Sequence, residues 1–266
     1  RERLEQLLCE CCRFGRTDAV LALLDESTVS ANATYRQATA LYFACNQANL
    51  KCAEALIKRG ADVMKTSQWM PRRQMYGGYD REIERVTPIH ELVSNWKEEN
   101  NSACRAILRL RVEAGADLEQ LNGSKNTALL VAAGVSTWYT HHSMCSLALK
   151  ALLKEGADAK VIEQKERSTV LHLVANQSRD LEAIKLLVEH GCDPNQTNFN
   201  KETPLLCALI KTGSSSTWPG DEGADEIVKF FLDQGVDPCH PDKYGRTAVY
   251  RSMEMSIGIF KLLLSR

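Results

Sequence analysis

The sequence predicts an all-α repeat protein, a solenoid of helix-turn-helix units joined by β-hairpin fingers. A Thr-led opening and a Gly-led closing recur, with regular spacing between them. Thr39 precedes Gly60 by 21 residues, and Gly115 precedes Thr127 by 12. The 12-residue interval recurs after Gly191 and Gly235. The openings begin at Thr39, Thr87, Thr127, Thr169, Thr203 and Thr247, and the closings at Gly60, Gly115, Gly156, Gly191 and Gly235.

Each element of the predicted unit has a local cause. The opening Thr caps the first helix, and a following Pro, as at Pro88, presets its φ. A short apolar second helix, such as the one around Ile184 and Leu187, cannot form a core alone and must pack against the next unit. The closing Gly supplies a left-handed C-cap. Between closing and opening, a turn such as residues 242–247 projects as a finger.

The opening Thr87-Pro88-Ile89-His90 resembles that of the ankyrin repeat, a unit of about 33 residues that begins Thr-Pro-Leu-His-x-Ala. The resemblance covers nearly the whole chain and implies a single domain over residues 1–266. It also implies that His90 and His172 hydrogen-bond the backbone across units and are structural. The units are expected at about residues 4–36, 37–64, 86–124, 125–166, 167–200, 201–244 and 245–266, with a finger insertion at 65–85.

Composition excludes several classes of protein. Hydrophobic residues make up 44% and charged residues 25%, and the net charge of −1 gives no general attraction to nucleic acid or acidic membranes. No apolar run is long enough to span a membrane. Of the ten cysteines, six fall on helical or turn positions of the repeat, as expected for reduced core thiols: Cys45, Cys52, Cys104, Cys145, Cys192 and Cys207. We therefore expect an intracellular protein, cytoplasmic or nuclear, and, because Arg1 is not Met, a fragment of a longer chain.

The largest break in the spacing lies between units two and three. Gly60 precedes Thr87 by 27 residues instead of 12, so the finger at 65–85 is greatly extended. Gly77-Gly78 is a two-residue hairpin signal, which predicts a protruding β-ribbon. Its aromatic and basic composition is typical of an interface hot spot. The residues concerned are Trp69, Arg72, Arg73, Tyr76 and Tyr79.

Three further insertions separate the two helices of a unit, and each contains a tryptophan: Trp96, Trp138 and Trp218. These side chains could anchor the insertions on their own helices, or they could form a second binding edge.

The first helices should form an inner face for a partner. We expect the residues four, seven and eight positions after each opening Thr to be exposed there, with an apolar centre flanked by amides. An extended segment of another protein would suit this groove, unless the inserted loops cover it. Counting finger tips and insertions, the predicted partner-binding residues are Phe43, Trp69, Arg72, Arg73, Tyr76, Tyr79, Glu91, Val131, Trp138, Tyr139, Leu173, Phe199, Tyr244 and Arg251.

No motif for catalysis, phosphate binding or dinucleotide binding occurs in the sequence. His141, His142 and Cys145 supply at most half a zinc site. The extended finger carries only a small excess of positive charge, a weak basis for nucleic-acid binding. We therefore expect no enzyme, metal, cofactor, nucleic acid or membrane partner.

The leading hypothesis is a protein-interaction scaffold. One alternative is a regulatory domain of a larger enzyme or channel. The other is a methyl-lysine reader, with Trp138 and Tyr139, or Trp69, Tyr76 and Tyr79, forming a cation–π cage.

Overall fold

The computed structural model describes residues 2–26, 28–68, 85–134, 146–177, 180–210, 224–253 and 257–265, and it is mostly helical. In chain order, the elements are α1 (Glu2–Arg13), α2 (Thr17–Asp25), β1 (Thr34–Tyr35), β2 (Ala38–Thr39), α3 (Ala40–Asn46), α4 (Leu50–Lys58), α5 (Pro88–Ser94), α6 (Asn101–Glu113), α7 (Ala128–Ala132), α8 (Ser146–Lys154), α9 (Val170–Gln177), α10 (Leu181–Glu189), α11 (Pro204–Ala208), α12 (Ala224–Asp233), α13 (Ala248–Ser252) and α14 (Ile257–Leu264).

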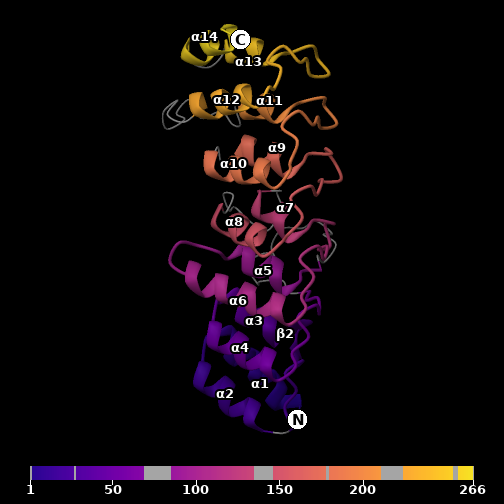
Figure 1. Ribbon diagram of the computed structural model, residues 1–266. Coiled ribbons are helices and arrows are strands. Elements are labelled where there is room, and N and C mark those ends of the chain that lie inside the picture. Colours follow the sequence, from indigo (N-terminus) through magenta and orange to yellow (C-terminus); the bar gives the residue numbers. More distant parts are fainter. Residues whose placement is uncertain are drawn as a thin grey trace. The chain divides into compact units, whose positions relative to one another are not determined.

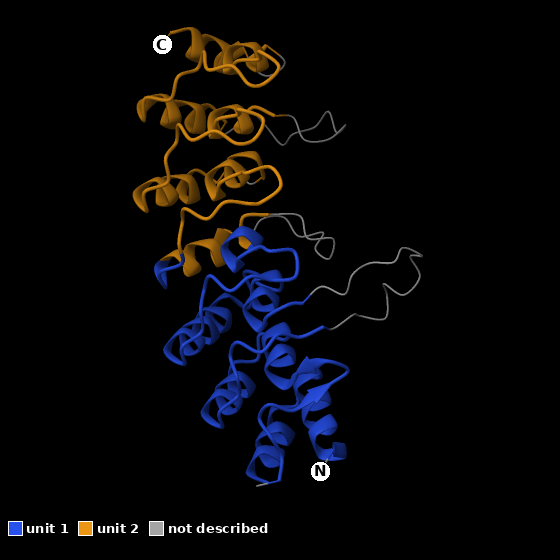
Figure 2. Ribbon diagram, turned by 90° about the vertical axis from the view of Figure 1, so that its right-hand side faces the viewer, with its two compact units in different colours: residues 1–131, 154–157 blue, residues 132–153, 158–266 orange. Residues whose placement is uncertain are grey.

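The chain divides into two compact units, coloured separately in Figure 2. Unit 1 comprises residues 1–131 and 154–157, and unit 2 comprises residues 132–153 and 158–266. The single domain expected from the sequence stays a prediction, and each unit is described by itself.

In unit 1, first helices pack on first helices and second helices on second helices. α3 lies between α1 and α5, while α4 contacts both α2 and α6 (Figure 1). Each helix pair therefore buries its apolar face against the pair before and after it, which is how a repeat too small for its own core becomes stable. The helix-turn-helix prediction is confirmed here.

Unit 2 repeats the arrangement with α9, α11 and α13 as first helices. α9 packs against α11 and α11 against α13, while α12 contacts α14 among the second helices. Leu205, Phe231 and Ile259 are fully or almost fully buried at these contacts.

Capping explains where the helices begin and end. Thr39 accepts a hydrogen bond from the backbone N–H of Tyr42, and Thr203 does the same for Leu206. Asp180 caps α10 through the N–H groups of Glu182 and Ala183. At the other end, Gly115 follows α6 with φ +84°, although a Cβ there would meet no atom within 4 Å. The requirement for glycine is therefore conformational rather than steric.

The fingers contain little regular strand. β1 and β2 pair antiparallel, with Thr34 opposite Thr39 and Tyr35 opposite Ala38. Arg36 and Gln37 between them both have positive φ, as a tight hairpin turn requires. At the base of the extended finger, Ser67 and Val86 exchange backbone hydrogen bonds of 2.7 and 2.8 Å. The ribbon predicted beyond them lies at residues 69–84, outside the described part of the chain.

Of the three interhelical tryptophans, only Trp96 lies within the described residues. It is 5% exposed, and its Nε1 donates to Asn101 Oδ1 at 3.1 Å, at the start of α6. Trp96 therefore anchors its insertion, which was the first of the two expectations. The cysteines at repeat positions that are described, such as Cys45 and Cys104, are buried free thiols, as expected for core residues.

The closing glycine provides a test of the capping account. Gly115→Ala should destabilise unit 1 by roughly 1 kcal/mol, because an L-residue is disfavoured at φ +84°. Gly123→Ala is the matched control, since Gly123 is also exposed but is not among the positive-φ glycines. Urea unfolding measures both, and equal losses for the two variants would contradict the account.

Candidate partner-binding surface

Phe43 corrects the prediction for the inner face. It was expected to be exposed four residues after Thr39, but its side chain is only 1% exposed. Its ring meets that of Tyr42 edge to face, with centroids 5.5 Å apart. Because α3 lies between α1 and α5, neighbours on both sides cover this position. Phe43 therefore belongs to the core of unit 1, and Cys207, at the same position in unit 2, is also buried.

Arg251 is the second correction, because it is buried in an ion network rather than available to a partner. Its Nη2 lies 2.7 Å from Glu202 Oε1 and 2.8 Å from Asp242 Oδ2. Its Nη1 donates to the carbonyl of Leu206 at 3.1 Å. Burial raises the pKa of Glu202, but hydrogen bonds from Asn198 and Arg251 outweigh it, and the net pKa is lowered. Arg251 therefore ties α13 to the preceding repeat within unit 2.

The other predicted inner-face residues remain partly accessible. Glu91, Val131 and Leu173 are half-buried. In unit 1, Glu91 accepts hydrogen bonds from the amides of Asn46 and Asn95, the latter at 2.9 Å. The pKa of Glu91 is raised by burial, which its neutral hydrogen-bond donors only partly oppose.

The inner face of unit 2 has a different chemistry. Leu173 and Ile210 are half-buried apolar residues on or beside its first helices, and Gln177 is exposed. The Oδ1 atom of Asn176 is buried and accepts no hydrogen bond from the described residues. A buried acceptor without a donor is costly, by about 1–3 kcal/mol. The accessible part of this face therefore combines apolar side chains with the exposed amide of Gln177.

The two opening histidines hold each first helix to the next finger. His90 Nε2 lies 2.9 Å from the carbonyl oxygen of Asn126, and Nδ1 lies 2.7 Å from Thr87 Oγ1. His172 repeats this with Glu202, at 2.8 Å from its carbonyl. Since a carbonyl only accepts, Nε2 of each ring must carry a proton. The Nδ1 atom of His172 accepts from the backbone N–H of Thr169 at 3.3 Å, and burial lowers the pKa of both histidines, which favours the neutral ring. The structural role predicted for both residues is confirmed.

Sequence reasoning missed the residues that shape the fingers. Asn122, Asn198 and Asp242 are buried, five positions before an opening Thr. The Asn198 side chain accepts from the N–H of Glu202 at 3.0 Å, and Asp242 accepts from that of Arg246 at 2.9 Å. Each folds its turn back on itself. The recurring Asn or Asp at this offset was the signal that could have identified them.

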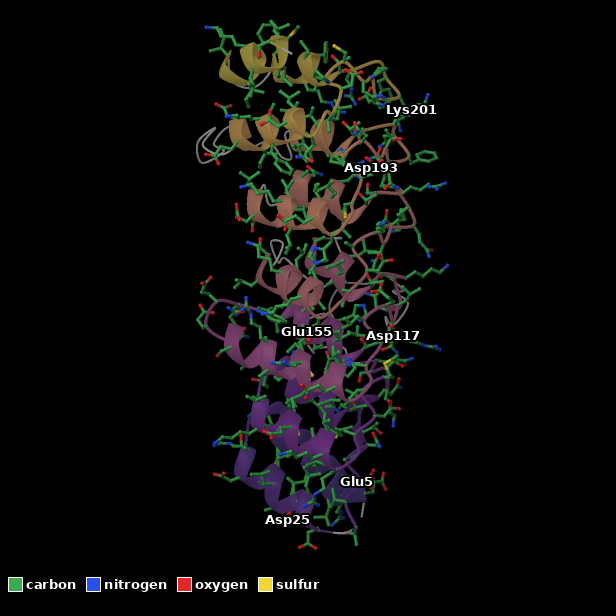
Figure 3. The ribbon with its side chains drawn as sticks, in the orientation of Figure 1. Glu5, Asp25, Asp117, Glu155, Asp193 and Lys201 are labelled. Atoms are coloured by element: carbon green, nitrogen blue, oxygen red, sulfur yellow. The ribbon has the colours of Figure 1, made fainter. Side chains whose placement is uncertain are left out.

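These turns display an aromatic and basic surface in unit 2. Phe199 and Tyr244 are 66% and 67% exposed. Lys243 Nζ lies 5.8 Å from the centre of the Phe199 ring and 5.0 Å from that of Tyr244. Figure 3 shows Lys201 on the side of unit 2 where the fingers lie. We define the finger-tip patch as Lys165, Arg167, Phe199, Lys201, Lys243 and Tyr244, all of them exposed.

Seven predicted binding residues fall outside the described part of the chain: Trp69, Arg72, Arg73, Tyr76, Tyr79, Trp138 and Tyr139. The same holds for His141, His142 and Cys145. Among the described residues, no cluster of three or more His, Cys, Asp or Glu side chains could hold a metal ion. None of the described helices is long and apolar enough to cross a membrane.

Comparison with known proteins gives consistent matches. A family model described as ankyrin repeats in three copies matches residues 3–67 and 140–217, just over half of the chain. The crystal structure of the ankyrin repeat domain of Bcl-3, a member of the IkappaB protein family, is similar with a TM-score of 0.68. The alignment covers 97% of both chains at 19% identity, so it supports the fold alone.

Two curated relatives are longer proteins. Mouse "Ankyrin repeat and SOCS box protein 16" is 26% identical over 176 residues, which cover 66% of this chain and 36% of the relative. A Caenorhabditis elegans homolog of transient receptor potential cation channel subfamily A member 1 is 27% identical over 199 residues. That match covers 66% of this chain and 15% of the channel homolog. The chain thus spans less than half of either relative.

Acid should weaken the histidine contacts. Burial lowers the pKa of His90 from 6.5 to about 4, and it also lowers the pKa of His172. Between these pH values the unfolded chain binds a proton that folded His90 does not, so stability falls as pH drops from 6.5 and levels off below 4. For His90 the loss in the free energy of unfolding amounts to roughly 3 kcal/mol.

Unfolding by urea at several pH values measures this loss. A His90→Gln variant should be less stable than the wild type at pH 7. Its free energy of unfolding should fall less than that of the wild type between pH 6.5 and pH 4. Parallel pH profiles for the two proteins would contradict the assignment of this loss to His90.

Proposed function

Because the chain belongs to the ankyrin repeat family, we propose that it is a protein-interaction module. It holds an extended segment of a partner protein along its first helices, and the finger at residues 65–85 contacts the same partner. It performs no catalysis and needs no cofactor, metal, nucleic acid or membrane. It acts inside the cell, in cytoplasm or nucleus, where thiols such as those of Cys45 and Cys104 stay reduced.

The observation that carries this proposal is the inner face of unit 2. Most of α9 is buried, yet Leu173 stays half-buried and Gln177 exposed. The exposed amide of Gln177 could hydrogen-bond the backbone of an extended peptide, while an apolar side chain of the peptide covers Leu173. Specific peptide recognition combines these two contacts in the same way.

Unit 1 supports the same role through polar chemistry. Glu91 sits among the amides of Asn46 and Asn95, without a cationic partner in the described residues. A basic side chain or an N–H group of the partner could approach the accessible part of this half-buried residue. Such a charge-assisted hydrogen bond is stronger than one between neutral groups.

The extended finger supplies the second contact of the proposal. Trp69, Tyr76 and Tyr79, with Arg72 and Arg73, have the composition that dominates binding energy at protein interfaces. The backbone bonds between Ser67 and Val86 hold the two ends of this finger together at its base.

A second candidate is a regulatory domain within a larger protein. It is favoured by the lengths of the relatives, since the chain covers 36% of one and 15% of a channel homolog. In that case the partner segment belongs to the same polypeptide. The sequence of the full gene product, examined for membrane spans or catalytic motifs, distinguishes the two candidates.

An affinity capture from cell extract tests the leading proposal. Val131→Asp combined with Leu173→Asp should reduce capture of a specific partner at least about tenfold, or 1.4 kcal/mol, because each charge enters the apolar inner face of its own unit. A second variant replaces Trp69, Arg72, Arg73, Tyr76 and Tyr79 by Ser or Ala and should lose the same partner.

The matched control is Leu21→Asp combined with Ile257→Asp, which places the same charges on exposed apolar residues of second helices. Circular dichroism and unfolding midpoints establish that every variant folds. Full retention of all partners by both test variants, or equal loss in the control, would refute binding at the inner face and finger.

A further inference from the structure

In the fingers of unit 2, most carboxylates are buried while most cations are exposed. The three turns at residues 163–168, 198–202 and 242–246 contain four carboxylates, of which Glu163, Glu202 and Asp242 are buried. Glu163 accepts from the backbone N–H groups of Lys165 and Glu166 at 2.8 and 2.7 Å. Among the described carboxylates of these turns, only Glu166 is exposed.

Most of the cations of the same turns lie at the protein surface. Lys165, Arg167, Lys201 and Lys243 are all exposed. Arg246 is half-buried and paired with Asp242 at 2.8 Å, so it adds little to the surface charge. The two buried carboxylates Glu202 and Asp242 are balanced by two guanidinium groups, those of Arg251 and Arg246. The finger tips are therefore distinctly positive, although the whole chain carries a net charge of −1.

The finger-tip patch is held in place before any partner arrives. The N–H of Phe199 donates to the carbonyl of Glu166 at 2.8 Å, and that of Lys243 to the carbonyl of Asn200 at 2.9 Å. These bonds fasten each finger to the one before it. Lys243 lies near both exposed rings, which places cation and aromatic surfaces together. A preorganised surface loses less entropy on binding.

We propose that the finger-tip patch binds an acidic segment of a partner protein, whose carboxylates meet Lys165, Arg167, Lys201 and Lys243 and whose apolar side chains cover Phe199 and Tyr244. This inference rests on the proposed interaction function and adds a contact surface and a partner chemistry to it. Exposed charges of one sign steer an oppositely charged partner and set specificity.

A peptide fits this surface better than nucleic acid does. A nucleic-acid-binding domain usually has a pI above 9, whereas this chain has a pI near 6.7. Carboxylates spaced by aliphatic residues match both the cations and the rings.

The test uses labelled 12-residue peptides that alternate Glu with Leu, Val or Phe in different orders, and the same peptides with Gln in place of Glu. Fluorescence anisotropy with the whole chain measures binding. At least one Glu peptide should bind roughly tenfold tighter than its Gln counterpart, and more salt should reduce that difference.

Charge reversal locates the site. Lys201→Glu combined with Lys243→Glu should weaken binding of the Glu peptide about tenfold. Lys165→Glu with Arg167→Glu, on the neighbouring finger, should act in the same direction. The matched control is Lys229→Glu with Lys261→Glu, two exposed lysines of second helices in the same unit, which makes the same change in net charge. This control should alter the affinity less than twofold.

Three results would overturn the inference: no preference for Glu over Gln in any peptide, equal weakening by control and test variants, or stronger competition by single-stranded DNA than by the unlabelled Glu peptide. The proposed function fails separately. If inner-face substitutions abolish capture of a partner but Lys201→Glu with Lys243→Glu leaves it intact, the scaffold role stands and the finger-tip inference falls.

Discussion

The hydrogen bond from an opening histidine to a carbonyl of the next finger is the interaction on which the partner-binding surface depends. His90 and His172 each join two groups through the imidazole ring: a threonine at the start of their own helix and the backbone of the following finger. No helix pair is stable alone, so a fixed link between neighbours sets both core packing and finger position. His172 thereby positions the finger that carries Phe199 and Lys201, next to the half-buried Leu173 on its own helix.

Much of the fold could be predicted from the sequence because its determinants are local. Thr203 caps its helix and Gly115 adopts positive φ whatever lies further along the chain, so residue type and spacing are enough to place them. The hairpin turn at Arg36 and Gln37 was harder to predict from the sequence, because neither residue type usually adopts positive φ. Only the neighbouring helices and strands hold them in that conformation.

The binding surface could be predicted only in part, because exposure depends on neighbours. Leu173 and Phe43 occupy the same repeat position, yet one is half-buried and the other is covered. Arg251 looks like a free surface cation until Glu202 and Asp242, 49 and 9 residues away, are brought beside it. The burial of carboxylates in the fingers likewise cannot be predicted from a count of charges along the chain.

Site-specific photo-crosslinking in cells tests the central claim, that partners meet the first helices and fingers rather than the second helices. A photoreactive phenylalanine analogue would replace Leu173 or Tyr244 in two proteins, and Glu182 or Lys229, which are exposed on α10 and α12, in two others. The account predicts crosslinked partner bands from the first pair and none from the second. Bands of equal strength from both pairs, or bands only from Glu182 and Lys229, would contradict it.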